Sequence, residues 1–249
     1  MKNPSEALII ALDGTIDQAM DWAQACQGAA DWVKVGMTLF YAQDPHIIEK
    51  FLAMGYRVFL DLKLHDIPHQ VESAAAILGK LGVGMLTVHA SGGPDMIRAA
   101  KRGSVNGAKD AGVGPPIILA VTVLTSMTDE VLEQIGVESS ALEQVKHLAK
   151  LAVESGADGI VCSAQEASTV REAIGVGPAI VTPGVRPKWA SSDDQARIVT
   201  PFEAISSGAT HLVVGRPITG HKNPQIAAQE VLSEISRARR VGKDTRCVP

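Results

Sequence analysis

Short apolar runs alternate along the chain with longer stretches in which apolar residues recur at helical spacing. The runs are almost entirely apolar, which is typical of parallel strands covered by helices on both faces. Glycine turns such as Gly55-Tyr56 and Gly156-Ala157 precede several runs and indicate a helix C-cap that leads into a strand. The expected strands are Ala7–Asp13, Trp32–Gly36, Arg57–Lys63, Met85–Ala90, Ile117–Leu124, Gly159–Ser163, Ala179–Thr182 and His211–Gly215.

Eight strand–helix units in 249 residues favour an α/β fold of the (β/α)8 TIM-barrel type over an open doubly wound sheet. No G-x-G-x-x-G motif follows the first expected strand, which argues against a dinucleotide-binding domain. No low-complexity linker divides the chain, so we expect one domain over residues 1–249, with a loosely held C-terminal tail at residues 242–249.

Composition and charge narrow the class of protein. The net charge of -4 and the lack of a basic block give no support for nucleic-acid binding. The three cysteines have no C-x-x-C spacing, which favours reduced thiols in the cytoplasm. The apolar run from Ala7 to Leu12 stops at Asp13 and is too short for a signal peptide or a membrane span. We therefore expect a cytoplasmic protein with neither a nucleic-acid nor a membrane partner.

The third expected strand carries charges inside an apolar run, in the stretch Phe59–Pro68. Because strand side chains alternate between two faces, Asp61 and Lys63 share one face and the leucines share the other. From these residues alone two interpretations stay open: a structural ion pair or half-exposed edge strand, and an active site. Asp66 follows three residues after Lys63.

Polar residues also stand at the carboxyl ends of other expected strands, where a barrel has its active site. Asp13 ends the first strand, Lys34 lies in the second, Thr87-Val88-His89 ends the fourth, and Thr122–Ser126 ends the fifth. A helix N-cap is the simpler explanation for Asp13 alone. Several polar ends that converge in one barrel favour an active site.

The seventh and eighth strands lead into glycine-containing turns with arginines. Main-chain N–H groups exposed by such glycines bind anions, and barrels often hold a substrate phosphate at this place. Arg216 would bind the phosphate through the N–H donors of its planar guanidinium. The other interpretation is that these are ordinary turn glycines beside a surface arginine. The polar segment Arg186–Gln195 is either a solvated loop or a lid over the phosphate. The turn residues are Pro183, Gly184, Gly215 and Arg216.

His65 and His69 are four residues apart, which raises the possibility of a metal site. Pro68 fits the first turn of a helix, so His65 lies outside that helix and the two imidazoles do not share a face. No H-E-x-x-H motif or third ligand is visible. We expect no metal.

With Asp61-x-Lys63-x-x-Asp66-Ile67-Pro68 on the third strand of a phosphate-binding barrel, the chain resembles the orotidine 5'-phosphate decarboxylase family. Metal-dependent hexulose-phosphate synthases and keto-gulonate-phosphate decarboxylases share the three charges. Those enzymes resemble one another in having an acidic metal ligand on strand two, where this chain has Lys34. They also usually have a small residue and a glycine where this chain has Ile67-Pro68. One departure is Gln70, where the family usually has threonine. The other matching segments are Ala11-Leu12-Asp13, Val33–Gly36, Val121–Ser126, Thr182-Pro183-Gly184, Asp194-Gln195 and Val214-Gly215-Arg216.

The resemblance implies cofactor-free decarboxylation of orotidine 5'-phosphate to UMP and CO2, the last step of de novo pyrimidine nucleotide synthesis. Lys63 would stabilise and protonate a carbanion at C6, within a charged network of Asp61, Lys63, Asp66 and Lys34. The resemblance also implies a homodimer in which Asp66 and Ile67 reach the neighbouring active site. The substrate-binding residues that it implies are Asp13, Lys34, Ile67, Thr125, Pro183, Gly184, Arg186, Gln195, Gly215 and Arg216.

Two other functions stay open at this point. One is a metal-dependent sugar-phosphate lyase or aldolase of the same barrel group. The other is a phosphoribosyl-ligand-binding barrel without catalysis, which the intact Asp61, Lys63 and Asp66 argue against because a binding protein has no need for a lysine between carboxylates.

Overall fold

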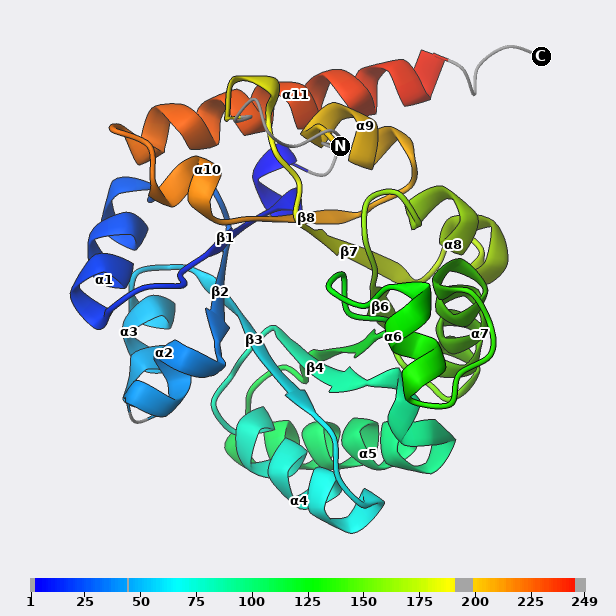
Figure 1. Ribbon diagram of the computed structural model, residues 1–249. Helices are drawn as coiled ribbons and strands as arrows, with labels where there is room; N and C mark the ends of the chain where they lie inside the picture. Colours follow the sequence, from blue (N-terminus) through cyan, green and yellow to red (C-terminus); the bar gives the residue numbers. More distant parts are fainter. Residues whose placement is uncertain (1–2, 44, 191–198, 245–249) are drawn as a thin grey trace. The chain divides into compact units, whose positions relative to one another are not determined.

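The computed structural model describes residues 3–43, 45–190 and 199–244. Its eight strands form a closed parallel barrel in chain order, so the predicted (β/α)8 fold is confirmed (Figure 1). Each of the eight predicted strands is present, with its ends shifted by a few residues at most. The strands are β1 (Leu8–Ala11), β2 (Trp32–Gly36), β3 (Arg57–Leu64), β4 (Met85–His89), β5 (Ile117–Val121), β6 (Gly159–Val161), β7 (Ala179–Pro183) and β8 (His211–Val214).

Main-chain contacts divide the chain into two compact units, residues 1–59 with 182–249 and residues 60–181. The boundaries fall at β3 and β7. The prediction of a single domain stays a prediction. The helices of the first unit are η1 (Pro4–Ala7), α1 (Ile16–Ala25), α2 (Met37–Ala42), α3 (His46–Ala53), η3 (Lys188–Ala190), α9 (Pro201–Ser206), α10 (Arg216–Thr219) and α11 (Pro224–Asp244). Those of the second unit are α4 (Pro68–Gly79), η2 (Ala90–Gly92), α5 (Gly93–Ala111), α6 (Asp129–Gln134), α7 (Ala141–Glu154) and α8 (Ala167–Ile174).

In the first unit, β1 lies between β2 and β8 and is buried along its whole length. Ile10 is the Cα partner of Val33 on one side and of Val214 on the other. This burial explains why the β1 sequence is continuously apolar, as expected for a parallel strand with two covered faces. α11 packs along α9 and continues to Asp244, so it includes the first residues of the segment predicted to be loosely held (Figure 1). Residues 245–249 of that segment lie outside the described residues.

In the second unit, α4 and α5 lie side by side in close contact (Figure 1). A methyl group at Gly107 would lie 1.9 Å from the carbonyl oxygen of Ala76, and one at Gly103 would lie 2.1 Å from that of Glu72. Glycine at these positions therefore lets the two helix backbones approach each other. Arg102 of α5 also reaches across to the Glu72 carboxylate, at 2.8 Å.

The expected glycine C-caps are confirmed where helices lead into strands. Gly55 and Gly156 have φ angles of +89° and +94°, in the left-handed region. The following N–H groups then turn back to the helix, from Tyr56 to the Phe51 carbonyl at 3.1 Å and from Ala157 to the Ala152 carbonyl at 3.0 Å. These bonds satisfy carbonyls that a helix end would otherwise leave unpaired.

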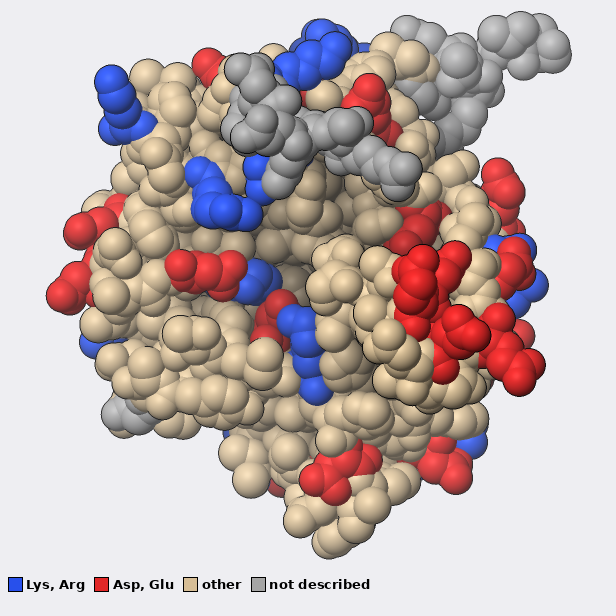
Figure 2. Space-filling view, in the orientation of Figure 1, with Lys and Arg blue, Asp and Glu red and all other residues tan. Residues whose placement is uncertain are grey.

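The stretch after β5 divides into two helices, α6 and α7. α6 ends at Gln134, Gly136 has a φ angle of +82°, and Ser140 caps α7 by accepting a hydrogen bond from the Glu143 N–H. Acidic side chains gather over α6 (Figure 2). Asp129 and Glu130 occupy its first turn, where the helix dipole favours negative charge. Within the described residues, no helix is long and apolar enough to cross a membrane.

Candidate active site

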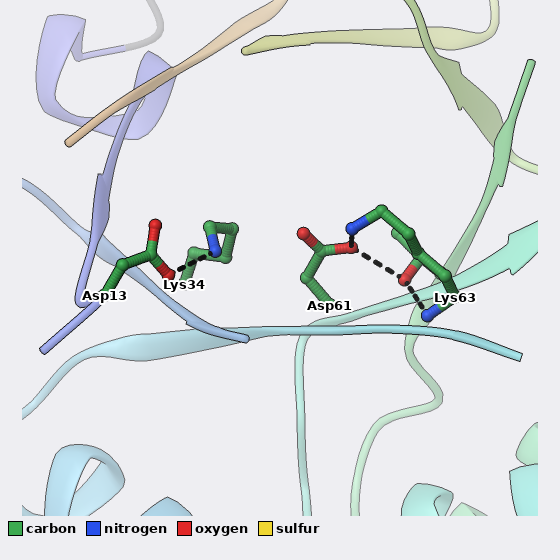
Figure 3. Close-up of polar contacts among 5 residues, drawn as sticks. Asp13, Lys34, Asp61 and Lys63 are labelled. Atoms are coloured by element: carbon green, nitrogen blue, oxygen red, sulfur yellow. Dashed lines mark hydrogen bonds and ion pairs between the residues drawn. The ribbon is translucent and has the colours of Figure 1, made fainter. Parts of the chain in front are cut away.

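The carboxyl end of β3 carries the predicted pair of opposite charges. The Nζ atom of Lys63 lies 2.8 Å from Oδ1 of Asp61, and their side chains are 26% and 14% exposed (Figure 3). The two side chains share one face of the strand, as the alternation predicts. Because both charges are largely removed from water, each depends on the other for compensation.

Lys63 has an unusual backbone. Its φ angle of +51° is the only positive value at a non-glycine residue in the part of the chain that the structure describes. A left-handed backbone costs an L-residue roughly 1–2 kcal/mol. Conformations of this kind persist where the surroundings enforce them, and they occur often at functional sites.

Thr87 of β4 supports both members of the pair. Its hydroxyl accepts a hydrogen bond from the Lys63 main-chain N–H at 2.9 Å and donates one to Oδ1 of Asp61 at 3.0 Å. The side chain is fully buried. The sequence placed Thr87 among the polar strand ends of the expected site, but it gave this residue no role and no partners, because those depend on how β4 is aligned with β3.

A second charged pair lies in the first unit, where β1 and β2 end. The Nζ atom of Lys34 lies 2.9 Å from Oδ1 of Asp13 (Figure 3). The Lys34 side chain is only 11% exposed, whereas that of Asp13 is 64% exposed. Thr15 caps α1 through a capping box with Gln18, so Asp13 is not the N-cap. An N-cap role therefore does not explain Asp13.

The predicted phosphate-binding arginines share a pocket in the first unit. Arg186, which follows β7, and Arg216, which begins α10, both line a cavity of about 310 Å³. Pro183 ends β7, and Gly184 has a φ angle of +76° that favours glycine. Gly215 is the N-cap of α10. The other lining residues are Trp189, Ala190, Pro217, Gly220 and His221.

Three predicted site residues lie on the surface of the second unit. Asp66 accepts a hydrogen bond from the Ile67 N–H at 2.7 Å, and among the described residues no ion pair joins it to Lys63. Ile67 is the N-cap of α4 and is 64% exposed, with Pro68 in the first helical turn as predicted. Thr125 is exposed in the turn after β5. Gln195 lies outside the described residues.

His65 and His89 form a contact that we did not predict. Their ring centroids are 5.3 Å apart, and His65 precedes α4 as expected. Burial lowers the pKa of His89, and the charges of His65 and Lys63 lower it further. Across the described ranges, no group of three or more His, Cys, Asp or Glu side chains is arranged to hold a metal ion.

The closed parallel barrel, with a lysine–carboxylate pair at the strand ends of each unit, has the features of a (β/α)8-barrel enzyme, a class whose polar groups lie at the carboxyl ends of the strands. Residues 6–231 match the model of the "Orotidine 5'-phosphate decarboxylase / HUMPS family", and the chain belongs to this family. The predicted resemblance is therefore confirmed.

Two relatives and one solved structure illustrate the similarity. The chain is 47% identical to an orotidine 5'-phosphate decarboxylase of Lactiplantibacillus plantarum over 241 residues, covering 95% of this chain and all of the relative. It is 45% identical to that of Heliobacterium modesticaldum over 233 residues, covering 93% and 96%. The crystal structure of orotidine 5'-phosphate decarboxylase from Lactobacillus acidophilus has a TM-score of 0.83 at 41% identity, covering 92% of this chain and 98% of that one.

Proposed function

We propose that this protein decarboxylates orotidine 5'-phosphate to UMP and CO2 without a metal or an organic cofactor, in the cytoplasm and as the last step of de novo pyrimidine nucleotide synthesis. Membership of the family and the names of the relatives support this reaction. The observation that carries the chemistry is the Lys63 ammonium, held 2.8 Å from the Asp61 carboxylate at the carboxyl end of β3.

The reaction needs a fixed positive charge. When the bond between C6 and the carboxylate breaks, its electron pair stays on C6 in the plane of the pyrimidine ring, outside the π-system. Delocalisation into the ring therefore cannot stabilise it, whereas a preorganised cation can. The Lys63 ammonium supplies that charge and then transfers one proton from Nζ to C6. The resulting neutral amine regains a proton from solvent after the product leaves.

The carboxylates keep the lysine in place. Asp61 binds Nζ of Lys63 directly, which opposes movement of the ammonium away from the reacting carbon. Asp61 would also place its negative charge close to the carboxylate that the substrate loses as CO2. We assign Asp66 to the site of a partner subunit in a homodimer, where it would provide the second carboxylate of the network. Its exposure in the single chain, and that of Ile67 beside it, support this assignment.

The remaining predicted residues bind the nucleotide. Asp13 and Lys34 would bind the ribose hydroxyls, because a carboxylate accepts and an ammonium donates hydrogen bonds. Thr125 would meet the edge of the pyrimidine. Arg186 and Arg216, on one cavity, would bind the phosphate dianion. The other proposed contacts to the nucleotide come from Pro183, Gly184, Gln195 and Gly215. We also assign Lys34 to the charged network of Asp61 and Lys63.

The test follows the absorbance of orotidine 5'-phosphate after it is mixed with purified protein. We expect substrate loss with stoichiometric UMP, unaffected by EDTA. Lys63→Ala should lower kcat/KM by at least ~10⁴-fold, since one group provides both the proton and the stabilising charge. Lys101→Ala is the matched control, because Lys101 also forms a half-buried ion pair, with Asp158 at 2.6 Å, and we give it no role in the reaction.

Each other outcome has a definite meaning. Activity that EDTA abolishes would indicate the metal-dependent lyase or aldolase. Nucleotide binding without any turnover would indicate a non-catalytic phosphoribosyl-binding barrel. A Lys63→Ala variant that keeps a tenth of the wild-type activity would refute the role of Lys63.

A further inference from the structure

Thr87 closes a ring of hydrogen bonds that begins and ends at Lys63. The Lys63 main-chain N–H donates to the Thr87 hydroxyl at 2.9 Å, and that hydroxyl donates to Oδ1 of Asp61 at 3.0 Å. The same oxygen of Asp61 accepts from Nζ of Lys63 at 2.8 Å. The backbone of the lysine is therefore connected to its own ammonium through two other side chains.

The direction of each bond in this ring is determined by chemistry. A main-chain N–H can only donate, so the Thr87 oxygen accepts from Lys63 and its proton must be directed elsewhere. An ionised carboxylate can only accept, and Asp61 provides the oxygen within reach. Thr87 is fully buried, so water does not compete for either bond.

The ring also explains how Lys63 keeps its strained backbone. At a φ angle of +51°, Lys63 directs its N–H to a side-chain oxygen. Loss of that oxygen would leave a poorly solvated N–H group without its partner and would remove a reason for the left-handed conformation. A relaxed backbone at Lys63 would carry its side chain to another position.

We infer that Thr87 is a positioning residue of this site, which holds the Lys63 ammonium and the Asp61 carboxylate in their reactive arrangement through its hydroxyl. Its catalytic consequence rests on the proposed function. The positioning itself does not rest on that function, because Thr87 would hold Nζ in place whether or not the protein turns over a substrate. Positioning matters for this reaction because a displacement of about 1 Å can lower a rate about 100-fold.

The experiment compares Thr87→Val, which removes the hydroxyl at nearly constant volume, with Thr87→Ser, which keeps it. For Thr87→Val we expect kcat to fall ~10- to 100-fold while KM changes less than about threefold, and Thr87→Ser should recover most of kcat. UMP titration by calorimetry gives the number of binding-competent sites, so that kcat is expressed per intact site. Crystal structures of wild type and Thr87→Val report the φ angle of Lys63 and the distance from its Nζ to Asp61.

Ser104→Ala is the control. The Ser104 side chain is also fully buried, but it lies in α5 and has no role in the site, and its hydroxyl donates to the main-chain carbonyl of Lys101, at 3.0 Å. This variant should lose stability to a similar extent and change kcat less than about threefold. It therefore measures the general effect of removing a buried hydroxyl.

Three results would overturn the inference: unchanged kcat per intact site in Thr87→Val, equal defects in Thr87→Val and Thr87→Ser, or an unaltered Lys63 and Asp61 in the Thr87→Val crystal. A wild-type protein without decarboxylase activity would contradict the proposed function alone. In that case the crystal structures still decide whether Thr87 positions the ammonium.

Discussion

At the scale of single residues, His89 lies where a positive charge is unfavourable. It is half-buried at the end of β4, and burial is the first cause of its lowered pKa. His65 and Lys63 add repulsion, and Asp61 offsets part of it. The folded protein therefore keeps His89 neutral at a pH where the unfolded chain already binds a proton.

This difference predicts how stability depends on pH. Because the folded pKa is below the unfolded value of 6.5, the contribution of neutral His89 is complete above pH 6.5 and is lost as the pH falls through and below that value. His89→Gln should therefore show a shallower loss of unfolding free energy below pH 6.5 than wild type. The difference in slope is at most about 1.4 kcal/mol per pH unit for one proton.

Urea denaturation at several pH values, at one protein concentration, measures the two profiles. A substitution that only disturbed packing would shift the profile by a constant amount at all pH values. Parallel profiles for wild type and His89→Gln would thus contradict the prediction, whereas profiles that converge toward low pH would support it.

Individual site residues differed in how far the sequence could predict them. The pairing of Asp61 with Lys63 was predictable because side chains two positions apart on a strand share a face. The left-handed backbone of Lys63 was not, because its residue type gives no sign of it. Thr87 was visible as a polar strand end, but its bonds to two charged residues depend on the alignment of neighbouring strands, which no local pattern specifies.

At the scale of helices and strands, the close packing of α4 against α5 predicts that a Gly→Ala substitution destabilises the protein, the opposite of what helix propensity predicts. An exposed Gly→Ala change inside a helix usually stabilises it by about 1 kcal/mol. At Gly107 the added methyl would lie 1.9 Å from the Ala76 carbonyl oxygen, and both backbones are held in helices. We expect Gly107→Ala to lower the unfolding free energy by about 2–3 kcal/mol, measured by urea denaturation.

Gly114→Ala is the control for this change. Gly114 lies between α5 and β5, and a methyl group there meets no atom within 4 Å. Its effect should stay within about 0.5 kcal/mol. A Gly107→Ala variant as stable as wild type would mean that α4 and α5 can separate without cost.

The elements themselves were easier to predict than their packing. Buried parallel strands have nearly continuous apolar sequences, so all eight could be located. The glycine turns gave the helix ends, as at Gly55 and Gly156. The glycines that permit close packing, Gly103 and Gly107, could not be interpreted from the sequence, because their effect depends on which helix lies opposite.

At the scale of the whole molecule, the number of strand–helix units predicted a closed barrel, and the motif on β3 predicted the family. The roles proposed for Asp66 and Ile67 are of another kind, because they refer to a second chain. Both residues are exposed in the single chain, and Ile67 is an apolar side chain at the start of α4. Burial of Ile67 against a partner subunit would remove this exposed apolar surface from water.

The proposed homodimer predicts complementation between two inactive variants. Lys63→Ala lacks the ammonium but keeps Asp66, and Asp66→Asn keeps the ammonium. If Asp66 acts across the interface, mixed dimers contain one intact site, and random reassociation at equal amounts should restore about a quarter of the wild-type activity. The measurement is the decarboxylation rate after the two variants are dissociated together in mild denaturant and reassociated.

The control mixes Lys63→Ala with Asp61→Asn. Asp61 and Lys63 form their ion pair within one chain, at 2.8 Å, so each mixed dimer would contain two damaged sites. We expect no gain of activity in this mixture. No gain with Asp66→Asn despite confirmed mixed dimers would contradict a shared active site, because Asp66 would then act within its own chain. Recovery in the control would contradict the assignment of Asp61 and Lys63 to the same chain.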